Sequence, residues 1–332
     1  MKAVQLFETG GPEVLNYVDI PTPTAGPGEV VVKSEFIGVG NPEISVRKGT
    51  YPWMPPLPAV PGIEMAGRIA AIGEGVTRLA IGDKVFVTAR ELPVRGGCYA
   101  EFVKASANAV YKLPEGVDLD AAACLCNYQV AWHLLRSAVP GAVYDTVLVW
   151  AAAGGVGTAI TQLAKLAGHT VIGIANGKAR ADFVLQQGAD HCIDRGQHRD
   201  LKGAVFDLTG GKGVDLILDP VGGNDFHLNF DLLANFGTVV SYGTLAGPVG
   251  DLSVQTMRKR SGASIGLRFF SMHSLDKAPA LRRAAMDELI PLLEARKISP
   301  PIFECIPLSE VRRAHVLFES GMASGKILLK PE

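Results

Sequence analysis

A short run of small residues near the middle of the chain has the spacing of a phosphate-binding turn. Between Val149 and Ile160 the sequence reads VWAAAGGVGTAI, and its alanines and glycines fit the pattern G-x-G-x-x-G with alanine in the first position. An apolar run precedes this turn and a helix-like segment follows it, so backbone N–H groups and the positive end of a helix would point at one place. Such a place suits a pyrophosphate, and the alternative is a tight turn without a ligand. The residues of the predicted cradle are Ala152, Gly154, Gly155, Val156 and Gly157.

The end of the next apolar run indicates which dinucleotide would bind. About 20 residues after the glycine turn, proteins that bind NAD carry an Asp or Glu for the ribose hydroxyls. Here the first carboxylate is Asp182, and Lys178 and Arg180 precede it. Cations at the start of a helix are unfavourable unless an anion is near, and a 2′-phosphate would be that anion. The alternative is that both cations are ordinary solvated residues. We therefore expect NADPH, with a phosphate pocket formed by Asn176, Lys178, Arg180 and Arg195.

The elements that must position these residues follow two patterns. Up to about residue 113, short β-branched runs alternate with Gly and Pro, which is typical of a compact, mostly antiparallel β domain. The segment 118–135 has a plausible N-cap and apolar residues at helical spacing, which predicts one long helix. From residue 145 apolar strands alternate with helices, as in a parallel sheet covered on both faces. We expect an α/β protein with a doubly wound parallel sheet at 123–265 and a mostly β domain at 1–122 that residues 266–332 complete.

Composition excludes several classes of protein. The 332 residues are 48% hydrophobic and 20% charged, which indicates a globular chain. Lys and Arg (32) nearly balance Asp and Glu (33), so neither a nucleic acid nor an anionic lipid surface is expected as a partner. No segment has the length and apolar composition of a membrane span or a signal peptide. Five scattered cysteines without a C-x-x-C pair fit a reducing compartment, and we expect a cytoplasmic protein.

With these motifs in hand, the chain resembles the medium-chain dehydrogenase/reductase superfamily over essentially its full length, and within it the zinc-free quinone oxidoreductase branch. The similar pieces are the VLVWAAAGGVG run, the strand start Gly82–Val85 (GDKV) and PGIEMAGRIAAIGEGV at 61–76. The resemblance implies a Rossmann domain for the dinucleotide and a GroES-like catalytic domain. It also implies a homodimer, in which the edge strands of the two nucleotide domains pair near GASIGLRFF (262–270).

The same resemblance argues against a catalytic metal. In zinc-dependent relatives a G-H-E segment carries a metal-ligating histidine, whereas this chain has Gly62-Ile63-Glu64. The usual cysteine ligand is absent from GVGNPE (38–43), and so is the lobe of closely spaced cysteines that binds structural zinc. We therefore expect no metal and a structural role for Glu64. By resemblance, Tyr242 and Gly243 at a strand end and Lys326 near the C-terminus contact the cofactor, although each is equally compatible with a strand end that binds nothing.

The segment that forms the active site in quinone oxidoreductases differs here at several positions. Relatives carry a pattern similar to G-V-N-x-x-D-x-Y-x-R-x-G-x-Y-P, and residues 38–52 read GVGNPEISVRKGTYP. Gly40 and Ser45 replace an asparagine and a tyrosine, and Val130 stands where relatives place a threonine. Tyr51 matches, and we expect its phenol to donate a hydrogen bond to the substrate oxygen while solvent supplies the proton. The competing interpretation is a tyrosine packed at a domain junction.

These residues favour hydride transfer from NADPH to a quinone or to the activated C=C bond of an enone. Charge in such substrates is delocalised, so weak donors suffice, whereas a simple ketone would need a Lewis acid or a well-placed donor. Two alternatives stay open. An enoyl thioester reductase would need cations for a CoA or carrier phosphate, for which Arg258, Lys259 and Arg260 are the available cluster. A protein that binds NADPH without catalysis is the second, because three polar side chains are lost around the predicted hydride site.

Overall fold

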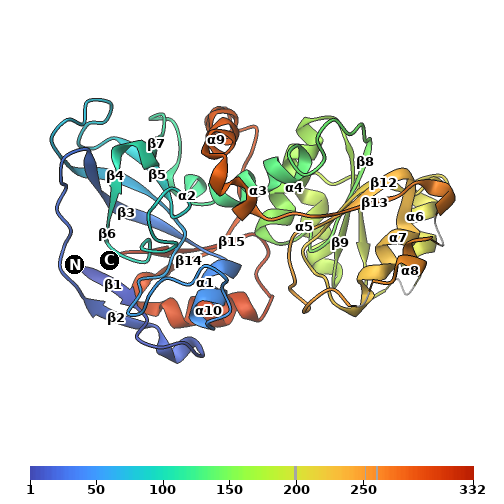
Figure 1. Ribbon diagram of the computed structural model, residues 1–332, viewed down its shortest axis with the longest axis horizontal. Helices are drawn as coiled ribbons and strands as arrows, with labels where there is room; N and C mark the ends of the chain where they lie inside the picture. The colour runs from blue at the N-terminus through green and yellow to red at the C-terminus, as the bar shows by residue number, and fades with distance from the viewer. Residues whose placement is uncertain (198–199, 251, 259–260) are drawn as a thin grey trace. The chain divides into compact units, whose positions relative to one another are not determined.

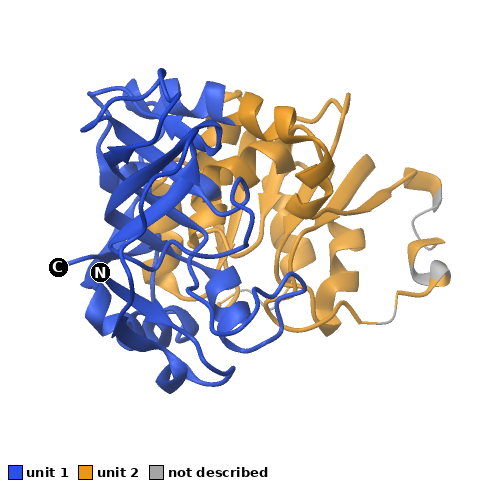
Figure 2. Cartoon of the chain, turned by 60° about the vertical axis from the view of Figure 1, so that its left-hand side comes forward, with its two compact units in different colours: residues 1–126, 286–332 blue, residues 127–285 orange. Residues whose placement is uncertain are grey.

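The chain folds into two compact units, coloured separately in Figure 2. The computed structural model describes residues 1–197, 200–250, 252–258 and 261–332. Unit 1 comprises Met1–Cys126 and Met286–Glu332, and unit 2 comprises Asn127–Ala285. Residues 266–285, expected from the sequence to complete the β domain, belong instead to unit 2, because the strand at 266–269 pairs with the strand before it. Lys259 and Arg260 of the basic cluster lie outside the described residues.

Unit 1 is built on mostly antiparallel strands, as the sequence predicted. A two-stranded sheet joins β1 and β2, and a seven-stranded sheet has the order β14-β15-β3-β4-β5-β7, with β6 paired to β3 (Figure 1). The strands are β1 (Lys2–Gln5), β2 (Asn16–Asp19), β3 (Glu29–Val39), β4 (Glu64–Ile72), β5 (Lys84–Thr88), β6 (Phe102–Ser106), β7 (Val110–Lys112), β14 (Ile302–Pro307) and β15 (Lys326–Lys330). The helices are α1 (Asn41–Arg47), α2 (Leu119–Ala122) and α10 (Val311–Glu319).

The segment expected to be one long helix forms two, which corrects the sequence interpretation. After α2 ends at Ala122, the N–H of Cys124 donates to the carbonyl of Ala121 at 3.1 Å, a tighter turn than that of an α-helix. The chain then begins α3 (Leu125–Leu135), in which the boundary between the two units falls. The return boundary falls inside α9 (Pro279–Glu294).

Unit 2 contains a six-stranded parallel sheet in the order β10-β9-β8-β11-β12-β13 (Figure 1). This order confirms the doubly wound sheet, and it reverses between β8 and β11, where such folds bind ligands outside the carboxyl ends of the strands. The strands are β8 (Thr146–Val149), β9 (Thr170–Ala175), β10 (His191–Asp194), β11 (Val214–Asp219), β12 (Leu233–Ser241) and β13 (Gly266–Phe269). The helices are α4 (Gly155–Leu166), α5 (Lys178–Gln186), α6 (Leu201–Leu208), α7 (Asn229–Leu232) and α8 (Val254–Arg258).

The central strands of unit 2 are buried on both faces. Val147, Leu148 and Val149 of β8 are inaccessible to solvent, as are Ile217 and Leu218 of β11. Such continuous apolar strands are what a parallel sheet covered by helices requires. The sheet core therefore holds the carboxyl ends of these strands, and the loops that follow them, in defined positions.

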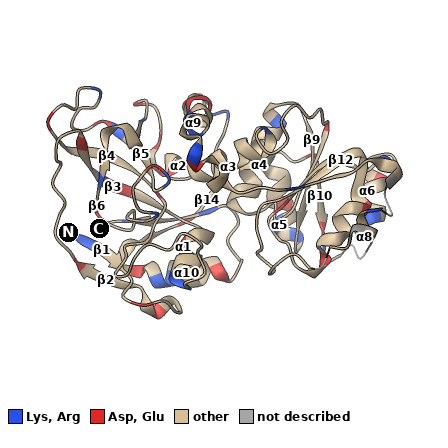
Figure 3. Ribbon diagram, in the orientation of Figure 1, with Lys and Arg blue, Asp and Glu red and all other residues tan. Residues whose placement is uncertain are grey.

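Charged side chains of both signs are interspersed over each unit (Figure 3). This distribution agrees with the formal net charge of −1. Within the described ranges, no helix has the length and apolar composition needed to cross a membrane. The five cysteines are free thiols, three of them buried.

Candidate functional site

The predicted phosphate cradle forms a sharp turn between β8 and α4. Ala151 has a positive φ of 52°. The N–H of Ala152 donates to the carbonyl of Ile174 in β9 at 3.1 Å, which ties the turn to the neighbouring strand. A Cβ on Gly157 would lie 2.5 Å from the carbonyl oxygen of Ala151 and 2.7 Å from the Cα of Ala152. Glycine is therefore needed at position 157 for α4 to pack this closely against the turn.

The start of α4 offers backbone N–H donors. Gly154 is the N-cap residue and has no side chain to bond the N–H groups of the first turn. A Cβ on Gly154 would meet nothing nearer than the carbonyl oxygen of Ala151, at 3.3 Å. On the other side, a Cβ on Gly155 would lie 2.3 Å from Nδ2 of Asn127, a side chain that sequence reasoning did not single out. A helix end without a side-chain cap fits a pyrophosphate.

The segment after β9 contains an anionic partner for Lys178. Gly177 has a φ of +88° and leads into α5, and Asn176 beside it is exposed. The Nζ atom of Lys178 lies 2.9 and 2.7 Å from the two carboxylate oxygens of Asp182, one turn further along the same helix. The anion that the sequence argument required for Lys178 is therefore present within α5. Arg180 is half-buried on the same helix.

Arg195 lies in the loop after β10, next to the end of β9. Its N–H donates to the carbonyl of Ala175 at 2.9 Å. Its guanidinium carbon lies 5.2 Å from the ring centroid of Trp150, which follows β8. A carboxylate oxygen of Asp225 is 3.8 Å from the guanidinium. The structure thus places Arg195 among the loops at the carboxyl ends of β8, β9 and β10.

A buried chain of hydrogen bonds connects the carboxyl ends of β8 and β11. The indole Nε1 of Trp150 donates to Oδ1 of Asn229 at 2.7 Å, and Nδ2 of Asn229 donates to Oδ2 of Asp219 at 2.6 Å. The other oxygen of Asp219 accepts the N–H groups of Val221 and Gly222. Burial raises the pKa of Asp219, although these hydrogen bonds oppose the rise. The network fixes the loop after β11.

Tyr242 and Gly243 follow β12 at the same edge of the sheet. The N–H of Tyr242 donates to the carbonyl of Asp219 at 3.0 Å. The hydroxyl of Tyr242 is buried and has no hydrogen-bond partner among the residues that the structure describes, and burial raises the pKa of this phenol. A Cβ on Gly243 would lie 2.7 Å from the carbonyl oxygen of Pro220, so this strand end needs glycine. A buried hydroxyl without a partner is a group that a ligand can satisfy.

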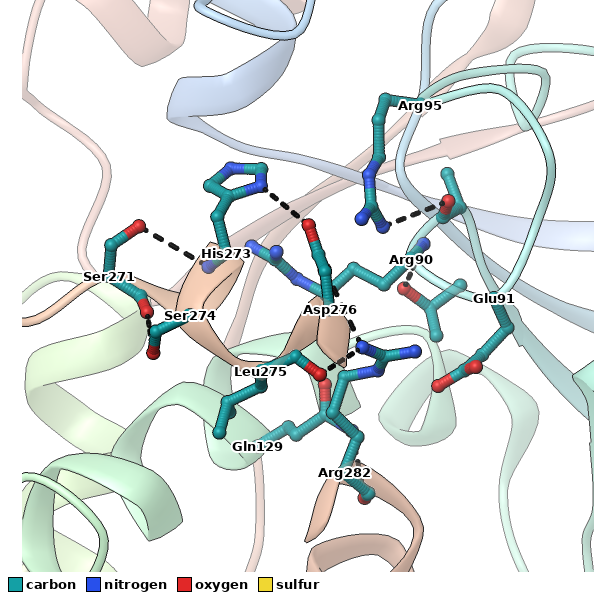
Figure 4. A network of polar contacts seen from close by, with 12 residues as sticks. Arg90, Glu91, Arg95, Gln129, Ser271, His273, Ser274, Leu275, Asp276 and Arg282 are labelled. Atoms are coloured by element: carbon teal, nitrogen blue, oxygen red, sulfur yellow. Dashed lines mark hydrogen bonds and ion pairs between the residues drawn. The ribbon is translucent and has the colours of Figure 1, made fainter. Parts of the chain in front are cut away.

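The turn after β13 carries a second polar cluster, shown in Figure 4. Nδ1 of His273 lies 3.4 Å from Oδ2 of Asp276, and the two side chains point toward each other. The other oxygen of Asp276 lies 3.5 Å from the guanidinium of Arg282. The hydroxyl of Ser271 accepts the N–H of His273 at 3.3 Å. His273 is therefore held beside a carboxylate.

Three charged side chains are buried together in unit 1. Lys326 of β15 places its Nζ 2.5 Å from Oε1 of Glu64 in β4, and the second oxygen of Glu64 accepts the N–H of Cys126 in α3. Glu43 of α1 is 1% exposed and accepts two backbone N–H groups. Burial raises the pKa of Glu43 to about 7, with Lys326 acting in the opposite direction. Burial works to lower the pKa of Lys326, but the adjacent Glu64 carboxylate raises it above its usual value.

This buried cluster gives structural roles to the residues that the sequence connected with a cofactor or a metal. Lys326 serves as a counter-ion to Glu64, and its contact with a cofactor stays a prediction. At the segment where zinc-dependent relatives carry a histidine, Ile63 contributes its N–H to Glu43 at 2.7 Å. In the part of the chain that the structure describes, no three His, Cys, Asp or Glu side chains lie close enough to hold a metal ion.

Tyr51, the predicted hydrogen-bond donor to substrate, lies just after α1. It is partly buried, its N–H donates to the carbonyl of Ser45 at 3.2 Å, and its ring meets that of Trp53 edge to face at 5.9 Å. Arg47 at the end of α1 is 1% exposed and lies 2.8 Å from a carboxylate oxygen of Glu319 in α10. These contacts anchor the segment that carries Tyr51.

Sequence reasoning missed three residues that organise the two units. Glu43, Trp150 and Asn229 all act through partners that are remote in sequence, so no local pattern identified them. The signal available for Trp150 was its place between the apolar strand and the glycine turn, where a large aromatic residue directly precedes a run of small ones.

Comparison with known proteins agrees with this arrangement. Residues 26–115 match the family model of the alcohol dehydrogenase GroES-like domain, and residues 155–285 match that of the zinc-binding dehydrogenases. These two matches fall in unit 1 and unit 2, respectively.

Full-length relatives are similar to the chain from end to end. The quinone oxidoreductase of Pseudomonas aeruginosa is 33% identical over 331 residues, covering 99% of both chains, and the human quinone oxidoreductase is 33% identical, covering 99% of this chain and 97% of its own. Among solved structures, the quinone oxidoreductase of Escherichia coli complexed with NADPH has a TM-score of 0.89 at 28% identity, and mycobacterial Rv1454c complexed with NADPH has a TM-score of 0.88 at 34% identity, each covering 100% of both chains. The chain therefore belongs to the quinone oxidoreductase branch of the medium-chain dehydrogenase/reductase superfamily.

Proposed function

We propose that this chain is an NADPH-dependent oxidoreductase that reduces a quinone, or the activated C=C bond of an enone, without a metal. The observation that carries the proposal is the glycine turn, because α4 begins at Gly154 without a side-chain cap, directly after the close turn that Gly157 makes possible. The buried hydroxyl of Tyr242, which has no partner within the described part of the chain, adds a donor at the same edge of the sheet. Relatives named quinone oxidoreductases, and similar structures complexed with NADPH, support the same function.

Each part of the chain has a distinct role in this proposal. Bound NADPH would supply the hydride. The N–H groups at the start of α4 would hold the pyrophosphate, and Arg180 and Arg195 would face the 2′-phosphate. Tyr51 would donate a hydrogen bond to the substrate oxygen, where negative charge develops, and water would supply the proton. Because a quinone or enone delocalises this charge, one phenolic donor suffices where a simple ketone would need a Lewis acid.

We also propose that the protein forms a homodimer through the edge of the unit 2 sheet. Among the described strands β13 ends the order of that sheet, so one of its sides pairs with none of them, and its Phe269 is 66% exposed. An exposed edge strand with an apolar side chain is suited to pairing with a second copy. Sedimentation that shows a monomer at micromolar concentration would argue against the dimer.

A cytoplasmic location is also part of the proposal. Five free thiols support it, since that compartment is reducing.

The test is anaerobic oxidation of NADPH in the presence of an ortho-quinone, compared with NADH and with the Arg180→Ala variant. Turnover should prefer NADPH, and the variant should raise the KM for NADPH while leaving that for NADH unchanged. An enone and an enoyl thioester serve as the other acceptors. Turnover with the thioester alone would contradict the quinone and enone assignment, and equal use of NADH would contradict the 2′-phosphate assignment.

A second candidate is a protein that binds NADPH without catalysis. The observation that favours it is the loss of polar side chains at Gly40, Ser45 and Val130. At Gly40 the backbone N–H is bonded to Glu43 within unit 1, at 2.9 Å. Tight NADPH binding without turnover on any of the three acceptors would support this candidate over the enzyme.

A further inference from the structure

The loop after β10 is fastened to the end of β9. Asp194, buried at the end of β10, accepts the N–H groups of Gly177 and Gly196 at 2.7 and 2.9 Å. The N–H of Arg195 donates to the carbonyl of Ala175 at 2.9 Å. Arg195 is therefore anchored beside the strand end at which proteins that bind NAD carry their ribose-binding carboxylate.

The guanidinium of Arg195 rests on the ring of Trp150. The separation of 5.2 Å from the ring centroid is within the range of a cation–π contact. Trp150 is 6% exposed, and its indole N–H is held by Asn229, which is held in turn by Asp219. The ring cannot turn without breaking this buried network, so the guanidinium has a fixed platform.

An aromatic ring and a carboxylate hold a cation in different ways. Trp150 carries no charge, so it orients the guanidinium of Arg195 and leaves its full charge for another anion. Asp225 is 3.8 Å away with a side chain two-thirds exposed, where water weakens the attraction. Lys178 is also exposed to water, with 76% of its side chain accessible, but both oxygens of Asp182 lie within 2.9 Å of it, so a phosphate would have to compete with a closer carboxylate than the one beside Arg195.

We propose that Trp150 is a positioning residue that gives this chain its preference for a 2′-phosphorylated dinucleotide, by holding Arg195 without neutralising it. The inference rests on the proposed NADPH function and names the residues that set its specificity. Arg195 contacts the phosphate, Trp150 acts through Arg195, and Lys178 contributes less than the sequence pattern suggests.

The experiment is a calorimetric titration of NADPH, NADH and adenosine 2′,5′-bisphosphate into the full-length protein. Arg195→Gln should weaken NADPH binding roughly 10- to 100-fold, as expected for the loss of a charged hydrogen-bond donor, and leave NADH binding within about 2-fold. Trp150→Leu should reduce the preference for NADPH over NADH by about 3- to 10-fold, because the platform is lost. Trp150→Phe keeps an aromatic face and should retain most of that preference. Lys178→Gln should have a smaller effect than Arg195→Gln.

A matched control exists elsewhere in unit 2. Arg136 stacks on Trp132 of α3 at 4.7 Å, a contact of the same kind, and Arg136 is exposed. Arg136→Gln should leave the affinity for NADPH and NADH unchanged. In the double variant Trp150→Leu/Arg195→Gln, the loss of preference should equal that of Arg195→Gln alone, since Trp150 acts through Arg195.

NADH affinity separates a positioning role from a merely structural one, because NADH needs the same turn and lacks the 2′-phosphate. An equal loss of NADPH and NADH binding in both Trp150 variants would overturn the proposal. A loss of preference in Lys178→Gln that exceeds the loss in Arg195→Gln would overturn it too. Failure of the unmodified protein to bind either dinucleotide would instead contradict the proposed function.

Discussion

The Nζ atom of Lys326 lies 2.5 Å from Oε1 of Glu64, and the two side chains are 6% and 1% exposed. Burial lowers the pKa of Lys326, whereas Glu64, then Cys124 and then Glu43 raise it. Lys326 is thus the buried partner of the Glu64 carboxylate, and the pair joins β4 to β15 in unit 1. The stability of this unit should depend on it.

Replacing Lys326 with methionine should destabilise unit 1 by about 3–5 kcal/mol, because a buried carboxylate loses its partner. The thermal midpoint of unfolding measures the loss. Lys330→Met is the matched control, since Lys330 ends the same strand in an exposed position. Equal shifts of the midpoint in the two variants would show that the buried pair of Lys326 and Glu64 does not stabilise unit 1.

The stability of unit 1 should fall as pH rises past the titration of Glu43. Burial raises its pKa from 4.5 to about 7, so the native state binds the proton more tightly than the unfolded chain. The resulting stabilisation, of order 3 kcal/mol, is fully present below pH 4.5 and is lost as pH rises to about 7. The thermal midpoint of the unmodified protein, relative to that of Glu43→Gln, should therefore be lower at pH 8 than at pH 5. A difference independent of pH would contradict this assignment.

Neutral His315 should make unit 1 less stable as pH falls, whereas Glu43 makes it less stable as pH rises. Burial, and then the neighbouring Arg47, lower its pKa from 6.5 to about 3. Its contribution to stability is present above pH 6.5 and is lost as pH falls toward 3, because the unfolded chain takes up the proton first. Between pH 7 and pH 4 the unmodified protein should lose more of its thermal midpoint than His315→Gln does. Parallel losses would mean that His315 is not held neutral.

Gly157 should not tolerate a side chain. A Cβ there would meet backbone atoms of Ala151 and Ala152 at 2.5 to 2.8 Å, and backbone cannot move aside as a flexible side chain can. Gly157→Ala should therefore destabilise unit 2 by roughly 1–3 kcal/mol, the usual cost of overpacking. Differential scanning calorimetry would register a lower transition temperature. An unchanged transition would show that the turn can open.

The fold was predictable because its signals are local. The change from short Gly- and Pro-punctuated runs to alternating apolar strands and helices lies in the sequence itself, and so does the glycine turn. The interactions that orient charged residues are not local. Lys326 and Glu64 are separated by 262 positions, and Trp150 and Asn229 by 79. The ion pair of Lys178 with Asp182 is an exception, because it spans only four positions of one helix, and the contact of Lys178 with a 2′-phosphate stays a prediction.

The measurement that tests the central claim most directly is a calorimetric titration of NADPH into the unmodified protein and the Gly154→Ala variant. Gly154 has a φ of −79°, which any residue adopts, and an added methyl would lie 3.3 Å from the Ala151 carbonyl oxygen, which has to move by only a few tenths of an ångström, so the variant should fold. Gly116→Ala, whose Cβ would lie 3.8 Å from its nearest neighbour in unit 1, is the control. Because the methyl occupies the space in front of α4, Gly154→Ala should keep its thermal midpoint and lose NADPH affinity at least about 10-fold, while Gly116→Ala loses none. Undiminished NADPH binding by a correctly folded Gly154→Ala variant would contradict the assignment of this turn as the phosphate site.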